Sequence, residues 1–170
     1  MSQVLLRWNL LLSNEAAQEV LPCCGSRAWA NGVANSRPIE DVATLLATSD
    51  RIWRDLSIAD WLEAFQNHPR IGETWAPRES SSRAQDWSVQ EQHRAAESDD
   101  SLKQALAEAN REYEQRFHLI FIICASGRSA EEILVHLRRR LHNDDTTELQ
   151  EAAEQQRRIT QIRLRKWLAE

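Results

Sequence analysis

The stretch SDDSLKQALAEANREYEQRF, residues 98–117, carries the pattern that decides the fold class. Within it, Leu102, Leu106, Ala109 and Tyr113 recur at helical spacing, which places them on one face of an α-helix. The whole chain of 170 residues holds only four glycines and four prolines, too few for the many turns of a β-sandwich or barrel. The sequence therefore predicts an all-α protein.

Capping signals indicate where other helices begin. Ser57 and Asp60, and likewise Ser129 and Glu132, have the spacing of a capping box, in which each side chain accepts a hydrogen bond from the backbone N–H of the other residue. Taken along the chain, such signals predict a bundle of about eight to ten helices. Because the sequence contains no internal repeat and no linker, we expect a single domain over residues 1–170.

Prolines and one long segment without periodicity separate the predicted helices. Pro22 is expected to end a helix that begins at Ser13, and Pro38 is expected in the first turn of a helix over residues 39–56. Residues 70–87 show no hydrophobic period and are expected to form a loop. Loops of this length inside a compact domain are usually functional or mobile.

Charge and cysteine content exclude several classes of function. The formal net charge is −5, whereas a protein that neutralises phosphates presents a basic surface. The arginines at 138–140 fall in the last turn of a predicted helix, where cations suit the helix dipole. The three cysteines have neither a disulfide framework nor zinc-binding spacing, and no run approaches the roughly 20 apolar residues of a membrane span. We expect a cytoplasmic protein without a nucleic-acid partner, membrane contact or metal site.

His68 is a candidate for acid–base chemistry. It lies where a helix must end, because Pro69 disfavours helical backbone in the residue before it. Imidazole has an unperturbed pKa near neutrality, which suits a general acid or base. A histidine at the C-terminus of a helix can equally be a charged end group that the helix dipole stabilises. The residues alone leave both interpretations open.

Glu91 and Arg163 also have two interpretations each. Glu91 follows Ser88 by three residues, so the pair is expected to open a helix as a capping box, although the carboxylate could instead accept two N–H bonds from an amide or urea group. Arg163 lies on the inward half of the last predicted helix, residues 147–168. A charge directed at a core needs a partner, which can be an internal carboxylate or a ligand.

Several segments, taken in order, resemble one known family. They are CCGSRAW (23–29), DWLEAFQNHPRIG (60–72), SVQEQ (88–92), FIICASG (121–127) with EIL (132–134), and ITQIRL (159–164). This ordered set resembles the family of 2-oxo-4-hydroxy-4-carboxy-5-ureidoimidazoline (OHCU) decarboxylases, which act between urate and allantoin. The chain departs from the family at His118-Leu119, where Gly-Phe is usual, and this departure leaves the three catalytic positions unchanged.

The resemblance implies an all-α homodimer that decarboxylates the small molecule OHCU to (S)-allantoin without a cofactor. It implies three catalytic residues, which are His68, Glu91 and Arg163. It also implies substrate contacts from Pro69, from the stretch Ser88, Val89, Gln90, Glu91 and Gln92, and from the backbone of Phe121, Ile122, Ile123, Cys124 and Ala125.

The residues leave two other functions open. In a non-catalytic helical binding module, His68 and Glu91 would act as helix caps and Arg163 would be paired internally. A related ureido hydrolase would release ammonia or urea, where a decarboxylase releases CO2. In the decarboxylase interpretation His68 handles the proton of a substrate hydroxyl, and whether it acts as acid, base or both stays open.

Overall fold

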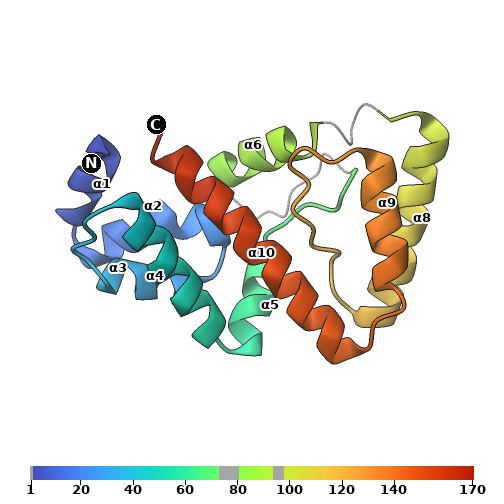
Figure 1. The fold of residues 1–170 in the computed structure, drawn as a ribbon, viewed down its shortest axis with the longest axis horizontal. Helices are drawn as coiled ribbons and strands as arrows, with labels where there is room; N and C mark the ends of the chain where they lie inside the picture. The colour runs from blue at the N-terminus through green and yellow to red at the C-terminus, as the bar shows by residue number, and fades with distance from the viewer. Residues whose placement is uncertain (1, 73–80, 94–97) are drawn as a thin grey trace. The chain divides into compact units, whose positions relative to one another are not determined.

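The computed structural model describes residues 2–72, 81–93 and 98–170. Within these ranges the regular secondary structure is entirely helical, which confirms the predicted all-α class. Figure 1 shows the helices α1 (Gln3–Asn9), α2 (Ser13–Cys24), α3 (Arg27–Asn35), α4 (Val42–Asp55), α5 (Ile58–Gln66), α6 (Ser82–Glu91), α8 (Asp100–Phe117), α9 (Ala130–Arg140) and α10 (Asp145–Trp167). None of the helices described is both long and apolar enough to cross a bilayer.

The chain folds as two compact units. Unit 1 comprises residues 1–64 and 157–170, and unit 2 comprises residues 65–156. The last helix, α10, contributes its residues up to Gln156 to unit 2 and its remaining residues to unit 1. The expectation of one domain over residues 1–170 stays a prediction, because compactness does not test whether either unit folds alone.

Tryptophans fill the core of unit 1, in which α2 lies against α3 and α3 against α4 (Figure 1). Trp8, Trp29 and Trp167 are fully buried, and the rings of Trp8 and Trp167 meet edge to face with their centroids 5.7 Å apart. The ring N–H of each of the three donates to an oxygen acceptor of the protein. Each indole therefore buries a large apolar surface without leaving its polar group unsatisfied.

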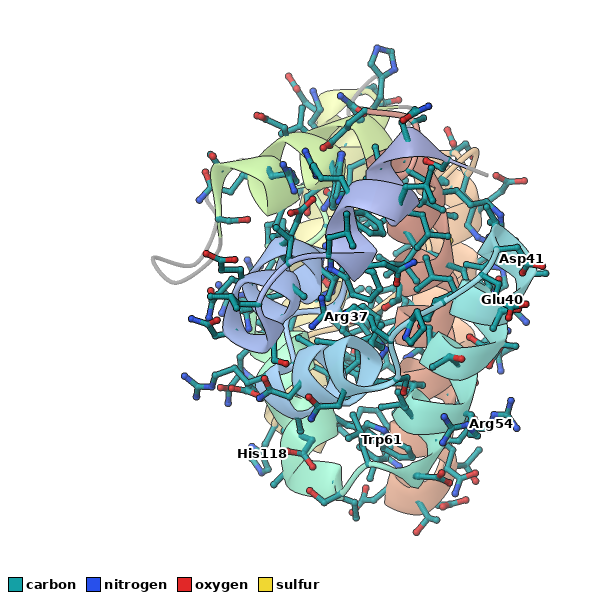
Figure 2. All side chains as sticks on the ribbon, turned by 90° about the vertical axis from the view of Figure 1, so that its left-hand side faces the viewer. Arg37, Glu40, Asp41, Arg54, Trp61 and His118 are labelled. Atoms are coloured by element: carbon teal, nitrogen blue, oxygen red, sulfur yellow. The ribbon has the colours of Figure 1, made fainter. Side chains whose placement is uncertain are left out.

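Arg37 holds together two helix ends in unit 1. Its guanidinium donates hydrogen bonds to the carbonyl oxygens of Trp8 at 2.9 Å, Leu11 at 2.7 Å and Ala34 at 2.7 Å. These carbonyls lie at or just beyond the C-terminal ends of α1 and α3. The last carbonyl groups of a helix have no N–H donor within that helix, so an arginine can serve as their donor. Figure 2 shows Arg37 among the helices of this unit, while Arg54 lies at the outer edge.

The core of unit 2 forms between α8 and α9, which lie side by side (Figure 1). The predicted stripe on α8 is confirmed, since Leu106, Ala109 and Tyr113 are buried and Leu102 packs against them. The apolar run between α8 and α9 has no regular secondary structure and contributes further to the core. Its buried members are Phe121, Ile122, Ile123 and Ala125, and Cys124 is half-buried.

A buried ion pair braces this core. Arg140 is 1% exposed and Glu148 is fully buried, and the Arg140 Nε donates to Glu148 Oε1 at 2.9 Å. The hydroxyl of Tyr113 also donates to Glu148, and Arg140 Nη1 donates to the carbonyl of Ile122 at 2.7 Å. The pair is thus surrounded by hydrogen bonds that offset the cost of removing two charges from water.

Two of the expected proline effects are wrong. Pro22 lies inside α2, which continues to Cys24 and ends at Gly25, whose φ of 89° favours glycine. A proline in a final turn removes only a single backbone hydrogen bond, so the helix does not have to end there. Pro38 is not in a first helical turn, because α4 begins at Val42 behind an aspartate cap at position 41.

Candidate active site

His68 lies on the predicted corner after α5. The capping box of Ser57 and Asp60 opens this helix, which ends at Gln66, two residues before the histidine. The side chain of His68 is buried, with an exposed fraction of 7%, and Pro69 is half-buried. The corner therefore directs the imidazole into the protein, where hydrogen bonds can fix the orientation of the ring.

Gln156 of α10 is a hydrogen-bond partner of the His68 ring. The Nε2 atom of His68 lies 2.7 Å from the amide oxygen Oε1 of Gln156, which is itself fully buried. The two residues are 88 positions apart in sequence. Because an amide oxygen only accepts hydrogen bonds, this contact requires a proton on Nε2 of the imidazole.

The residues after His68 are held firmly by α8. Arg70 donates two parallel hydrogen bonds to the carboxylate of Glu114, at 2.6 and 2.9 Å. The side-chain amide of Asn110 donates to the carbonyl of Ile71 at 3.3 Å, and the side chain of Ile71 packs in the core of unit 2. These contacts of Arg70 and Ile71 with α8 limit the motion of the corner that carries the imidazole.

The SVQEQ segment lies at the end of a helix, and the expected capping box there is wrong. Helix α6 begins behind Ser81, whose hydroxyl accepts from the backbone N–H of Ala84 at 3.2 Å. Ser88 is buried in the helix and donates its hydroxyl to the carbonyl of Ala84 at 2.9 Å. A serine can cap a helix or bond the carbonyl four residues back, and spacing alone does not distinguish the two. Glu91 is the last residue of α6.

The predicted loop over residues 70–87 is wrong in its last part, because residues 82–87 are helical. Residues 73–80 of that loop lie outside the described part of the chain. The loop prediction failed because α6 starts within a run of serines, which has no hydrophobic period.

The histidine corner is hydrogen-bonded to the SVQEQ segment. The backbone N–H of Gly72 donates to the side-chain oxygen of Gln92 at 3.1 Å. Glu91 and Gln92 are half-buried, whereas Val89 and Gln90 are exposed, Val89 by 65%. The two segments that resemble the family's catalytic motifs are therefore brought into contact in unit 2.

A second glutamine of α10 holds the apolar run. The backbone N–H of Cys124 donates to Oε1 of Gln155 at 3.0 Å, and the carbonyl of Cys124 accepts from Nε of Arg128 at 3.1 Å. Sequence reasoning missed both Gln155 and Gln156. Their distance of three and four residues from the buried Ala152 was an available signal, because it places them on the inward face of the helix.

Arg163 is buried in unit 1, with 2% of its surface exposed, as its position on the inward half of the helix predicts. Burial raises the pKa of the nearby Cys24 thiol, and hydrogen bonds of that thiol with Ser26 and Thr160, together with the positive charge of Arg163, oppose the rise. Burial outweighs them and raises the pKa of Cys24 to about 12. Cys24 is therefore a protonated thiol at neutral pH and is no nucleophile.

Unit 2 thus contains the His68 corner, the SVQEQ segment and the apolar run, while Arg163 belongs to unit 1. The assignment of His68, Glu91 and Arg163 as catalytic residues stays a prediction. In the described part of the chain, no group of three or more His, Cys, Asp or Glu side chains has the arrangement of a metal site.

Comparison with known proteins identifies the family. The family model of OHCU decarboxylase matches residues 9–165, which is nearly the whole chain. The chain belongs to the OHCU decarboxylase family. The resemblance expected from the sequence segments is confirmed.

Two relatives of this OHCU decarboxylase family member have names that refer to uric acid degradation or to OHCU decarboxylation. The uric acid degradation bifunctional protein TTL of Arabidopsis thaliana is 41% identical over 145 residues, which cover 85% of this chain and 44% of the relative. The 2-oxo-4-hydroxy-4-carboxy-5-ureidoimidazoline decarboxylase of Haloferax volcanii is 25% identical over 134 residues, covering 76% of this chain and 74% of the relative. The chain therefore spans less than half the length of the plant relative.

Solved structures agree with the family assignment. A crystal structure of OHCU decarboxylase in the presence of (S)-allantoin matches with a TM-score of 0.77 and 37% identity, covering 89% of this chain and 98% of that one. A crystal structure of (S)-allantoin synthase matches with a TM-score of 0.70 at 19% identity, covering 96% of this chain and 53% of that one. The second likeness supports the fold alone.

Proposed function

We propose that this protein is a cofactor-independent carboxy-lyase that converts OHCU to (S)-allantoin in urate catabolism. The observation that carries the proposal is the buried His68 ring, held by Gln156 in the same unit in which Gly72 contacts Gln92. Family membership over residues 9–165 gives this site its reaction. The related OHCU decarboxylase crystallised with (S)-allantoin gives further support.

The chemistry of the substrate explains why no cofactor is required. Decarboxylation breaks the bond between a ring carbon and its carboxylate, CO2 leaves, and the bonding electron pair stays on the ring. An adjacent ring imine can accept that pair, which leaves an enol with the hydroxyl on the carbon that lost CO2. That hydroxyl then loses its proton and becomes a carbonyl, and a proton adds to the neighbouring ring carbon, which carries the ureido group, to complete allantoin. The protein therefore has to orient the substrate, polarise it and deliver a proton to one face.

In this proposal His68 moves the proton. It removes the proton of the substrate hydroxyl or returns one to the ring carbon, and delivery to a single face gives the S enantiomer. General acid–base catalysis of this kind contributes about 10²–10⁴-fold. Burial of the ring protects the step from bulk water, which would protonate either face.

We assign the remaining polar groups of the substrate to different polar side chains of the protein. The side-chain oxygen of Gln92 already accepts from Gly72, so we assign its NH2 group to the ureido carbonyl and the Glu91 carboxylate to the ureido N–H groups. Ser88, Val89, Gln90 and Pro69 are assigned to further contacts with this part of the substrate. Arg163 is assigned to the anionic and polar ring groups, since a guanidinium pairs well with a carboxylate.

The apolar run from Phe121 to Ala125 is assigned to backbone contacts with the ring. The N–H of Cys124 already donates to Gln155, and the carbonyl of Ile122 already accepts from Arg140. We therefore assign the substrate contacts of this segment to the remaining backbone groups on either side of Cys124.

We also propose that the protein acts as a cytoplasmic homodimer, as the family resemblance implies. All three cysteines are free thiols, which suits a reducing compartment. Analytical ultracentrifugation at assay concentration tests the dimer. A sedimentation coefficient that corresponds to a 19.7 kDa monomer would contradict the proposed homodimer.

Circular dichroism tests the reaction directly. Urate oxidation product is generated fresh and mixed with the protein, and the dichroic signal of chiral allantoin is followed together with released CO2. We expect an allantoin signal well above the spontaneous rate and CO2 as the small product. Release of ammonia or urea would indicate a hydrolase, and no reaction at all would favour a binding module.

A further inference from the structure

We propose that Gln156 is a positioning residue that fixes the tautomer and the orientation of the His68 ring for proton transfer. This inference rests on the proposed function, because it assigns Gln156 a part in the reaction of His68. It is carried by one contact, the 2.7 Å approach of Gln156 Oε1 to His68 Nε2.

The contact is a well-formed hydrogen bond between two buried groups. Its length is at the short end of the range for N–H···O bonds in proteins. Gln156 is fully buried and His68 is 7% exposed, so water does not compete freely for either atom. A buried amide and a buried imidazole that satisfy each other are held in one mutual orientation.

The amide oxygen determines which nitrogen of the ring carries the proton. Oε1 of Gln156 has only lone pairs to offer, so Nε2 of His68 is the N–H and the lone pair of the neutral ring lies on Nδ1. The amide carries no charge, so it does not trap the imidazolium as a carboxylate would. A ring held in this way can take up a proton and release it again within one turnover.

The neighbouring residue shows that this part of α10 holds two site segments. Gln155 binds the backbone N–H of Cys124 while Gln156 binds the ring of His68. Both glutamines are buried side chains on a regular helix. Functional groups are positioned best by side chains that extend from rigid elements, and two consecutive amides meet that requirement.

The first test measures the tautomer by ¹⁵N NMR of protein labelled at its five histidines, with His68→Ala to assign the signal. We expect His68 of the wild type to be protonated on Nε2. Replacement of Gln156 by Met keeps the volume and removes the strong acceptor, so Gln156→Met is expected to give a mixture of tautomers. Gln150→Met, at an exposed position of the same helix, is the matched control and should leave the signal unchanged.

The second test separates kcat from KM in the allantoin assay. We expect Gln156→Met to lower kcat by about 10- to 100-fold, the scale measured when a metal-bound histidine loses its outer hydrogen-bond partner, with KM within about threefold of wild type. A purely structural role would lower the amount of folded enzyme, which circular dichroism reports, and would leave kcat per folded molecule unchanged.

Each outcome decides between the alternatives. A wild-type His68 protonated on Nδ1 would overturn the inference even if Gln156→Met fails to fold, and so would a Gln156→Met variant with unchanged tautomer, whatever its rate. An unchanged kcat with an altered tautomer would overturn the role in the reaction. A wild type that makes no allantoin would sink the proposed function while the NMR result still decides the tautomer.

Discussion

Two buried polar pairs of unit 2 differ in the charge of their partners. Arg140 meets the carboxylate of Glu148, whereas His68 meets the uncharged amide of Gln156. The first pair is locked, because proton loss or gain by either member would leave an unpaired charge in the core. In the second pair the amide oxygen can accept a hydrogen bond from Nε2 whether the imidazole is neutral or charged. Charge pairing suits a rigid core, whereas an uncharged partner suits the proton transfer that we propose for His68.

The largest expected effect comes from breaking the neutral pair at the histidine. His68→Ala should lower kcat for allantoin formation by about 10²–10⁴-fold, because general acid–base catalysis is lost. The helical circular dichroism spectrum should persist. His142→Ala, at an exposed position of unit 2, is the control and should retain its rate. A near-normal rate in His68→Ala would remove His68 from the mechanism.

Breaking the charged pair should instead affect stability. Glu148→Gln removes the nearer carboxylate from the buried guanidinium of Arg140, whose Nε lies 4.0 Å from Glu151, and should lower the free energy of unfolding by about 3–5 kcal/mol. Urea denaturation measures this change. Asp100→Asn, which removes the exposed carboxylate near Lys103, is the control and should leave the midpoint nearly unchanged. Equal midpoints for the two variants would show that the buried pair does not stabilise unit 2.

Alkaline pH tests a third kind of buried group, which is a side chain that is uncharged at neutral pH. Burial raises the pKa of Cys24 from 9.0 to about 12, and burial also raises the pKa of Tyr113. The protonated forms are favoured in the folded state, so their contribution is complete below pH 9 and is lost as the pH rises from about 9 towards 12. Urea denaturation at pH 8 and pH 10 should show this loss. Cys24→Ala should have a shallower dependence on pH, and an equal slope would contradict the assignment to Cys24.

The smallest expected effect concerns the anchor of the histidine corner. Arg70 and Glu114 are only partly buried, so Glu114→Gln should lower the free energy of unfolding by about 1 kcal/mol or less. The same variant should reduce kcat several-fold if the pair limits motion of the corner. Thermal unfolding and the allantoin assay report the two effects separately. A loss of stability comparable to that of Glu148→Gln would show that the Arg70–Glu114 pair stabilises the fold as strongly as the buried Arg140–Glu148 pair.

Two arginines show how far sequence patterns reach. Arg163 was placed on an inward face by its helical spacing, and it is buried. Arg140 was predicted only to lie in the last turn of a helix, where a cation suits the dipole, and it is equally buried. Spacing predicted the first because the face of a helix is a local property. The second depends on Glu148 and on Ile122, which the chain brings there only on folding.

The sequence by itself determined the helical class, the capping boxes at Ser57 and Ser129, the stripe on α8 and the family segments, because each of these depends on residues within a few turns of one another. Only the tertiary structure decided the partner of His68 and the joining of Gly72 to Gln92. These contacts link residues 88 and 20 positions apart, and no local pattern encodes which distant side chains will satisfy each other once water is removed.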